Sequence, residues 1–211
     1  MIIKSIGYDQ QEIINNILTL HNHGRSIEFD PCYNVGAFYR NGVVCGPETK
    51  SDINPLLSGV QKLDVRNLPF ASGRFNSIIF DPPFIVTGGK DGRMSNLYGS
   101  FGSVAALEQF YRESLISLQR VLRARGILIV KTQDFVNGRK QHIFLNYVLN
   151  LAGELSFVVK DLFVLLAKSR PISKTFKQQH ARKFHSYFLV LKKSRRASAG
   201  DFAGPRKKEV A

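Results

Sequence analysis

One tetrapeptide carries the clearest chemistry in the sequence. Asp81-Pro82-Pro83-Phe84 directly follows an apolar run at 77–80. Proline donates no hydrogen bond to a strand ladder, and the residue before a proline avoids the α region, so a buried strand ends here in a stiff, extended corner. The corner presents a carboxylate, which accepts hydrogen bonds, beside an aromatic ring. Open α/β sheets bind ligands at the carboxyl ends of their strands, so this corner is the first candidate for a functional site.

Three further aspartates stand at the ends of short segments of strand character upstream. They are Asp30, which ends 27–30, Asp52 within 50–55, and Asp64 within 61–65. Each one alone is compatible with a solvated loop or a cap residue. Their recurrence at successive strand ends, ahead of Asp81 at another, argues against coincidence.

The elements that must position these side chains follow from hydrophobic periodicity. Helices are predicted at 9–23, capped by Asp9, at 104–123, ended by Gly126, and at 139–153. Strands are predicted at 27–30, 50–55, 61–65, 77–80, 127–130, 157–167 and 186–191. Strands that alternate with helices and finish in two closing strands favour an α/β, doubly wound sheet with helices on both faces.

Length and composition bound the organisation of the chain. We expect a single domain over 1–193 and a basic tail over 194–211 that has little to bury and is disordered. No apolar run is long enough for a membrane span, and no leader segment is visible. Only Cys32 and Cys45 are present, which is typical of a reduced, cytoplasmic setting; association with a nucleoid is compatible with it.

The positive charge is confined to one half of the chain. Residues 1–119 hold ten basic and eleven acidic side chains, whereas residues 120–211 hold twenty and five, which gives the net charge of +14. This asymmetry exceeds what solubility needs and indicates a nucleic acid as partner, DNA in preference to RNA. The candidates for phosphate contacts are Lys90, Arg93, Lys131, Arg139, Lys140, Arg182 and Lys183. His180 and His185 have no cysteine near them, so no metal site is predicted.

The corner at Asp81 resembles the catalytic motif of the S-adenosylmethionine-dependent amino-methyltransferases, which methylate exocyclic nitrogens of bases. More narrowly, residues 29–39 resemble the first motif of small phage-type and bacterial DNA methyltransferase-like proteins, which also place a Leu-Pro-Phe, here 68–70, ahead of the Phe-Asp-Pro-Pro. The resemblance covers about residues 9–193 and implies a class I methyltransferase fold. One departure is that Gly36 stands alone, where the family has a loop with two spaced glycines.

The resemblance implies S-adenosyl-L-methionine as cofactor and a role for each matching residue. It assigns Asp52 to the ribose and Asp64 to the adenine edge, where carboxylates accept charge-assisted hydrogen bonds better than amides do. The methionine end of the cofactor is assigned to Asp30, Pro31 and Gly36, with the aromatic rings of Tyr33 and Phe38 near the sulfonium.

The same resemblance gives the corner a mechanism. An exocyclic amine is a poor nucleophile because its lone pair is delocalised into the base. When Asp81 accepts one N–H and the carbonyl of Pro82 the other, the nitrogen can pyramidalise, and the positive charge that develops on it is stabilised. Pro83 stiffens the corner, and Phe84 stacks on the base after it leaves the helix. The glycine-rich loop 87–102 is expected to close over the target nucleotide.

Three functions remain open from the sequence. The first is a DNA amino-methyltransferase that acts on adenine N6 in preference to cytosine N4. The second is an RNA enzyme that acts on guanine N2 or adenine N6, and the third is a catalytically silent nucleic-acid-binding protein with the same fold. The chain has little room for a separate recognition domain, so a methyltransferase of this size is expected to read a short or relaxed target.

Overall fold

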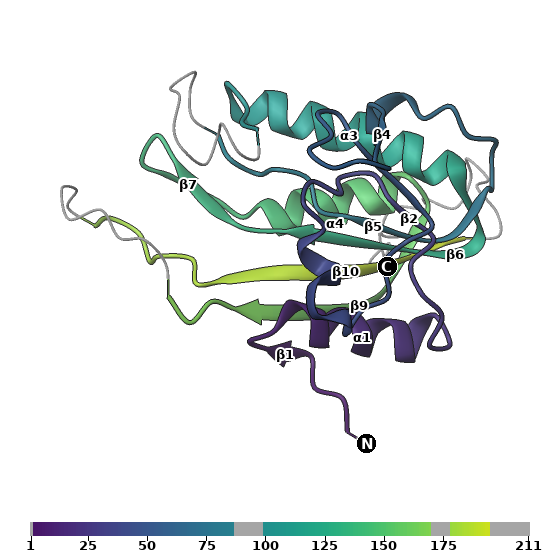
Figure 1. The fold of residues 1–211 in the computed structure, drawn as a ribbon. Coiled ribbons are helices and arrows are strands. Elements are labelled where there is room, and N and C mark those ends of the chain that lie inside the picture. The colour runs from purple at the N-terminus through teal and green to yellow at the C-terminus, as the bar shows by residue number, and fades with distance from the viewer. Residues whose placement is uncertain (1, 87–98, 170–177, 195–211) are drawn as a thin grey trace, which may run out of the picture.

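The structure is a computed structural model that describes residues 2–86, 99–169 and 178–194. One sheet of eight strands forms its centre, in the order β1-β9-β10-β6-β5-β2-β3-β4 (Figure 1). Its strands are β1 (Ile6–Gly7), β2 (Phe29–Asp30), β3 (Thr49–Asp52), β4 (Gln61–Lys62), β5 (Phe75–Phe80), β6 (Leu122–Thr132), β9 (Phe157–Leu166) and β10 (His185–Lys193). Among these strands only β10 runs antiparallel to its neighbours. The predicted doubly wound α/β architecture is therefore confirmed.

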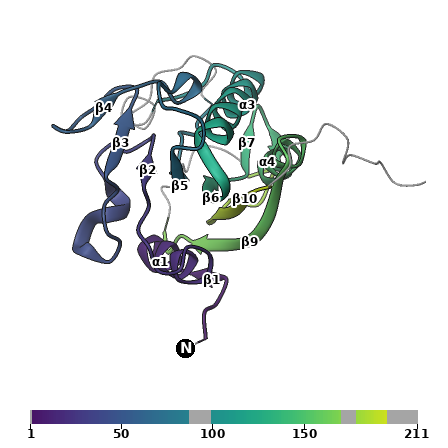
Figure 2. The ribbon, with the colours of Figure 1, turned by 90° about the vertical axis from the view of Figure 1, so that its right-hand side faces the viewer.

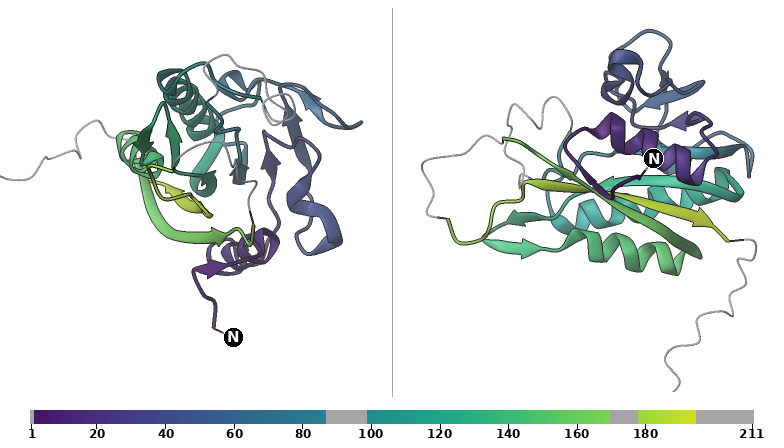
Figure 3. Two further views of the ribbon diagram at one scale, coloured as in Figure 1. Left: turned by 90° about the vertical axis from the view of Figure 1, so that its left-hand side faces the viewer. Right: turned by 90° about the horizontal axis from the view of Figure 1, so that it is seen from below.

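Helices cover both faces of the sheet, as Figure 2 and Figure 3 show from opposite sides. The helix α1 (Gln10–His21) lies on one face, and α3 (Val104–Val121) and α4 (Phe144–Glu154) lie on the other. The central strands are buried on both faces: Ile78 and Phe80 pack toward α3, whereas Ile79 packs toward α1. Alternation of side chains along a strand explains this split, and it also explains why these strands are apolar throughout.

Besides shifts at the ends of several strands, two boundaries differ clearly from the sequence predictions. The helix α3 ends at Val121, and Gly126 lies inside β6 instead of capping a helix. A Cβ at Gly126 would stand 2.8 Å from the carbonyl oxygen of Asn76 and 2.9 Å from that of Arg123, so the glycine permits a close approach of β6 to β5. Part of the predicted helix at 139–153 is instead the hairpin of β7 (Phe135–Asn137) and β8 (Lys140–His142).

The order of the strands sets the place of the site. The chain moves from β2 outward to β3 and β4, and then returns to lay β5 against the other side of β2. The boundary between β2 and β5 is thus a topological switch point, where open sheets of this kind form their ligand crevice. Within the described part of the chain, no helix has the length and apolar character to cross a membrane. Of the predicted tail at 194–211, residues 195–211 lie outside the described ranges.

Candidate functional site

Asp81 and Lys131 meet at the carboxyl edge of the sheet. Phe80 and Val130 are paired in register on the parallel strands β5 and β6, so the next residue on each strand, Asp81 and Lys131, projects from the same face. Lys131 Nζ donates to Asp81 Oδ2 at 3.0 Å, and the two side chains are 14% and 24% exposed. The sequence predicts Lys131 as a phosphate contact on the surface. The structure places its partly buried ammonium group beside Asp81.

Aromatic rings and one amide hold the Lys131 ammonium group. Lys131 Nζ lies 5.0 Å from the ring centre of Phe38 and 5.6 Å from that of Phe188, both of which are buried. It also donates to Gln10 Oε1 at 3.4 Å, at the start of α1. Cation–π contacts of this kind stabilise a partly desolvated ammonium group. Phe38, predicted to lie near a sulfonium, therefore lies near a lysine here.

Asp30 ends β2 on the other side of the switch point and is buried. Its carboxylate accepts hydrogen bonds from the backbone N–H of Cys32 at 3.0 Å and from Tyr39 Oη at 2.9 Å. The pKa of Asp30 is raised from 3.8 to about 7, mainly by burial and also by the negative charges of Asp81 and Asp52, while the two hydrogen bonds act in the opposite direction. Asp30, Asp52 and Asp81 stand at the carboxyl ends of the adjacent strands β2, β3 and β5, and we call these three residues the acidic edge.

The loop after β2 runs through the acidic edge. Burial raises the pKa of the Cys32 thiol, and the charges of nearby aspartates add to the shift. Pro31 is buried, and Gly36 adopts a φ of 66°, in the left-handed region that favours glycine. A Cβ at Gly36 would stand 2.7 Å from Tyr33 Oη, so the glycine also leaves room for the Tyr33 ring, which stacks on Tyr39 at 5.5 Å.

Asp52 ends β3 and holds the loop after β2 in place through a hydrogen bond. Its Oδ2 accepts the backbone N–H of Asn34, and its Oδ1 accepts that of Asn54, both at 2.9 Å. A carboxylate oxygen has two lone pairs. The hydrogen bonds therefore fix the orientation of Asp52 and leave acceptor capacity for a ligand hydroxyl.

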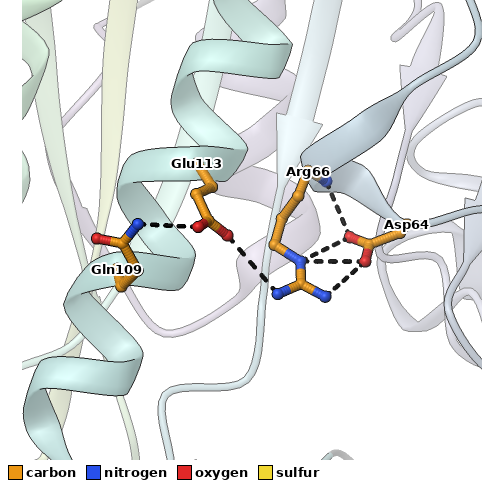
Figure 4. Close-up of polar contacts among 4 residues, drawn as sticks. All are labelled: Asp64, Arg66, Gln109 and Glu113. Carbon is orange, nitrogen blue, oxygen red and sulfur yellow. Dashed lines mark hydrogen bonds and ion pairs between the residues drawn. The ribbon is translucent and has the colours of Figure 1, made fainter.

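Asp64 follows β4 and is already engaged by a basic neighbour (Figure 4). It caps the short 3-10 helix η2 (Val65–Asn67), and Arg66 contacts both of its carboxylate oxygens, at 2.6 Å for the shortest pair. The Arg66 side chain lowers the pKa of Asp64. Arg66 also approaches Glu113 at 3.6 Å, and Gln109 donates to Glu113. A ligand amine at Asp64 would share this carboxylate with Arg66.

Several predicted phosphate contacts gather at the hairpin of β7 and β8. Arg139 and Lys140 lie at its turn and are exposed. His180 Nε2 contacts the carbonyl oxygen of Arg139 at 2.7 Å, which ties the segment that carries Arg182 and Lys183 to the hairpin. We call these four basic residues the basic hairpin cluster. Lys90 and Arg93, with most of the predicted loop 87–102, lie outside the described residues.

Sequence reasoning missed a buried polar network behind the site. Asp134, just after β6, accepts a hydrogen bond from the backbone N–H of Leu145 at 3.1 Å and from Tyr187 Oη at 3.1 Å. Tyr187 Oη in turn contacts His185 Nε2 at 2.9 Å, and burial raises the pKa of Tyr187 to about 12. The signal was available, because Asp134 is one more aspartate just beyond a buried strand.

A cavity of about 450 Å³ opens beside Gln10, between the start of α1 and the end of β9. Tyr8 and Lys168 line it, and Lys168 Nζ lies 5.9 Å from the centre of the Tyr8 ring. Because Gln10 also contacts Lys131, the cavity adjoins the corner at Asp81. Among the described residues, no group of three histidine, cysteine or acidic side chains is placed to hold a metal ion.

Comparison with known proteins supports the fold. No protein-family model matches the sequence, and no curated protein matches it. A candidate sarcosine dimethylglycine methyltransferase from Galdieria sulphuraria superposes with a TM-score of 0.50 at 13% identity, over 87% of this chain and 85% of that one.

Two structures from Thermus thermophilus show a weaker likeness. The protein TrmN has a TM-score of 0.49 at 14% identity, over 89% of this chain and 50% of its own. A candidate DNA modification methylase, solved in complex with S-adenosyl-L-methionine, has a TM-score of 0.43 at 17% identity, over 68% and 56%. The chain thus spans about half the length of these two proteins. The strand order and the Galdieria likeness together show a doubly wound, Rossmann-like fold of the class I methyltransferase type.

Proposed function

We propose that this chain is an S-adenosylmethionine-dependent methyltransferase that methylates the exocyclic amino group of a base in DNA, adenine N6 in preference to cytosine N4. The observation that carries the proposal is the acidic edge. Asp30, Asp52 and Asp81 stand at the ends of three adjacent strands around the switch point of the sheet. The methyltransferase fold and the resemblance of residues 81–84 to an amino-methyltransferase motif support it.

The acidic edge fits a cationic cofactor. Asp30 is buried, and among the described residues its carboxylate accepts hydrogen bonds from neutral groups alone. A positive charge nearby would favour the ionised form of this carboxylate. In the proposal, Asp30 and Tyr33 lie at the methionine end of S-adenosylmethionine, and Asp52 accepts from the ribose hydroxyls. When bound, the cofactor supplies an electrophilic methyl group.

Asp81 and Pro82 then act on the target base. Asp81 accepts one N–H of the amino group, and the carbonyl oxygen of Pro82 accepts the other, which lets the nitrogen release its lone pair. Positive charge develops on the nitrogen as the methyl group arrives, and both oxygens stabilise this charge more than they stabilise the ground state. Phe84, half-buried beside the corner, offers a face on which a flipped base can stack.

The basic hairpin cluster is the proposed contact for the nucleic-acid backbone. Its two halves are tied together by the contact of His180 with Arg139. The hairpin follows the carboxyl end of β6, which pairs in parallel with β5, so it projects from the same edge of the sheet as Asp81. Contacts to phosphate position a duplex and carry no sequence information. The cluster therefore supports binding to nucleic acid of many sequences, in keeping with a short target.

The decisive experiment incubates the protein with S-adenosylmethionine labelled in the methyl group and with separate pools of DNA and RNA, which are then digested to nucleosides. The proposal expects label on N6-methyladenine from the DNA pool. Label on N4-methylcytosine alone would overturn the adenine preference, and label confined to RNA would establish the RNA enzyme instead.

A calorimetric titration with S-adenosylmethionine separates both enzymes from a silent binder. The proposal expects saturable binding. A protein that binds DNA and shows neither cofactor binding nor methyl transfer would contradict the enzymatic proposal and leave a nucleic-acid-binding protein with this fold.

A further inference from the structure

Lys131 is a strongly polar group in the corner at Asp81 for which the amino-methyltransferase mechanism has no use. It lies within a hydrogen bond of the carboxylate that is proposed to accept the target amine. Its ammonium group stands between the sheet and α1, held by Phe38, Phe188 and Gln10. A side chain held this closely beside a reacting carboxylate is well placed to act on the same ligand.

The hydrogen-bonding capacity of the pair is not exhausted. An ammonium group has three donors, of which the described residues use one on Asp81 Oδ2 and one on Gln10 Oε1. The two rings hold the positive charge without supplying a lone pair. Within the described ranges, Oδ1 of Asp81 accepts no hydrogen bond from another side chain. One N–H donor of Lys131 and the Oδ1 acceptor of Asp81 therefore remain in the same corner, on two groups that the Nζ–Oδ2 hydrogen bond of 3.0 Å holds together.

This donor and acceptor match a particular edge of a base. The edge must carry an amino group with an acceptor atom next to it, as adenine does with N6 beside N7 or N1 and cytosine with N4 beside N3. The Watson–Crick edge of guanine places an N–H donor next to its amino group, which would meet the ammonium group of Lys131 with like polarity. A site that pairs the acceptor of the correct base rejects a base that lacks it.

We propose that Lys131 is a specificity-determining residue, which donates to the ring nitrogen beside the target amino group while Asp81 accepts from the amino group itself. This inference rests on the proposed function of the same site. It assigns the target to a base edge of the donor–acceptor kind, and it gives Lys131 a role distinct from a phosphate contact.

The test measures methyl transfer by the wild type and by a Lys131 variant on the natural base and on two analogues of it. Wild type and Lys131→Met are assayed on one DNA duplex that carries adenine, 1-deazaadenine or 7-deazaadenine at the methylated position. Methionine keeps the length and apolar packing of the lysine stem against Phe38 and Phe188. One of the two analogues lacks the ring nitrogen that accepts from Lys131. Because this hydrogen bond has a charged donor, we expect its loss to lower the wild-type kcat/KM by about 10- to 100-fold. In Lys131→Met, that analogue and adenine are expected to react at equal, reduced rates.

Several outcomes would overturn the inference. If neither analogue slows the wild type, or if the losses from the analogue and from Lys131→Met multiply independently, Lys131 does not contact the ring nitrogen. A variant that only raises KM and lowers the salt dependence of binding would make Lys131 a phosphate contact. Lys131→Arg, which keeps a donor, is expected to retain discrimination against the sensitive analogue, and thermal unfolding shows whether each variant folds. Absence of wild-type activity on adenine itself would instead refute the proposed function.

Discussion

Tyr39 Oη donates to Asp30 Oδ2 at 2.9 Å, so a neutral phenol is the side-chain partner of a buried carboxylic acid at the switch point of the sheet. The phenol cannot neutralise a carboxylate, and burial holds the pKa of Asp30 at about 7, well above its usual 3.8. The acidic edge thus carries a proton near neutral pH that a cation would displace.

Asp30 makes the stability of the protein depend on pH. The folded protein binds a proton at Asp30 that the unfolded chain has released, so the free energy of unfolding falls as pH rises from about 4 to about 7. Between pH 5 and pH 8, we expect Asp30 to lower the free energy of unfolding by roughly 2 to 3 kcal/mol. Asp30→Asn should lack this loss, which urea denaturation at both pH values measures.

Tyr39→Phe provides the matched comparison for this prediction. It removes a hydrogen bond that lowers the pKa of Asp30, so the loss of stability should extend to higher pH than in wild type. An Asp30→Asn variant with an unchanged pH dependence would show that another group is responsible.

Asp81→Asn should abolish most methyl transfer and spare cofactor binding. The amide replaces one carboxylate oxygen with a donor and removes the negative charge that stabilises the developing ammonium, so we expect kcat to fall by at least about 100-fold. Calorimetry with S-adenosylmethionine should give an affinity close to that of wild type. Glu154→Gln, at the exposed end of α4, is the control and should leave both quantities unchanged. Wild-type turnover in Asp81→Asn would remove Asp81 from the mechanism.

Gly126→Ala should be strongly destabilising. Its new methyl group would lie 2.8 Å and 2.9 Å from two backbone carbonyl oxygens, which cannot rotate away as a side chain does. We expect a loss of roughly 2 kcal/mol or more, in the range of overpacked interior positions. At Gly46 nothing stands within 4 Å of a built Cβ, so Gly46→Ala should stay within about 0.5 kcal/mol of wild type in the same denaturation experiment.

Arg139→Ala and Lys140→Ala should weaken binding to DNA of any sequence. Each variant removes one proposed phosphate contact, so the slope of log affinity against log salt should fall by about 1 in magnitude. Fluorescence anisotropy at several salt concentrations measures both quantities. Lys160→Ala, on an exposed position of β9, serves as the control. If all three variants behave alike, the basic hairpin cluster is not the contact surface.

The sequence predicted the local features well and the long-range ones incompletely. Two prolines force β5 to end at Phe80, just before Asp81, and continuous apolar runs identify the central strands, so the architecture follows from local signals. The contact of Asp81 with Lys131 depends on the register of β5 against β6, across 50 residues, and no local pattern fixes it. The resemblance assigns Asp64 to the adenine edge of the cofactor, whereas its pairing with Arg66 depends on the turn geometry of η2.

The two misplaced boundaries have different causes. Gly126 follows a helical stretch, where glycine commonly ends a helix, but here the tertiary contact of β6 with β5 decides its role. The hairpin of β7 and β8 was visible in principle, because Asn137-Gly138 is a strong signal for a tight turn. Its short strands were merged with the apolar periodicity of the helix that follows.

The pairing of β1 with β9 has a practical consequence. Ile6 and Gly7 run alongside Val164 and Leu165, and Ser5 accepts a hydrogen bond from the backbone of Val164 at 2.7 Å. The two residues of β1 therefore cover part of an edge of the long strand β9 that would otherwise be open to pairing with another chain. A shortened variant that starts at Tyr8 would uncover that edge and invite self-association, so expression trials should retain these first residues.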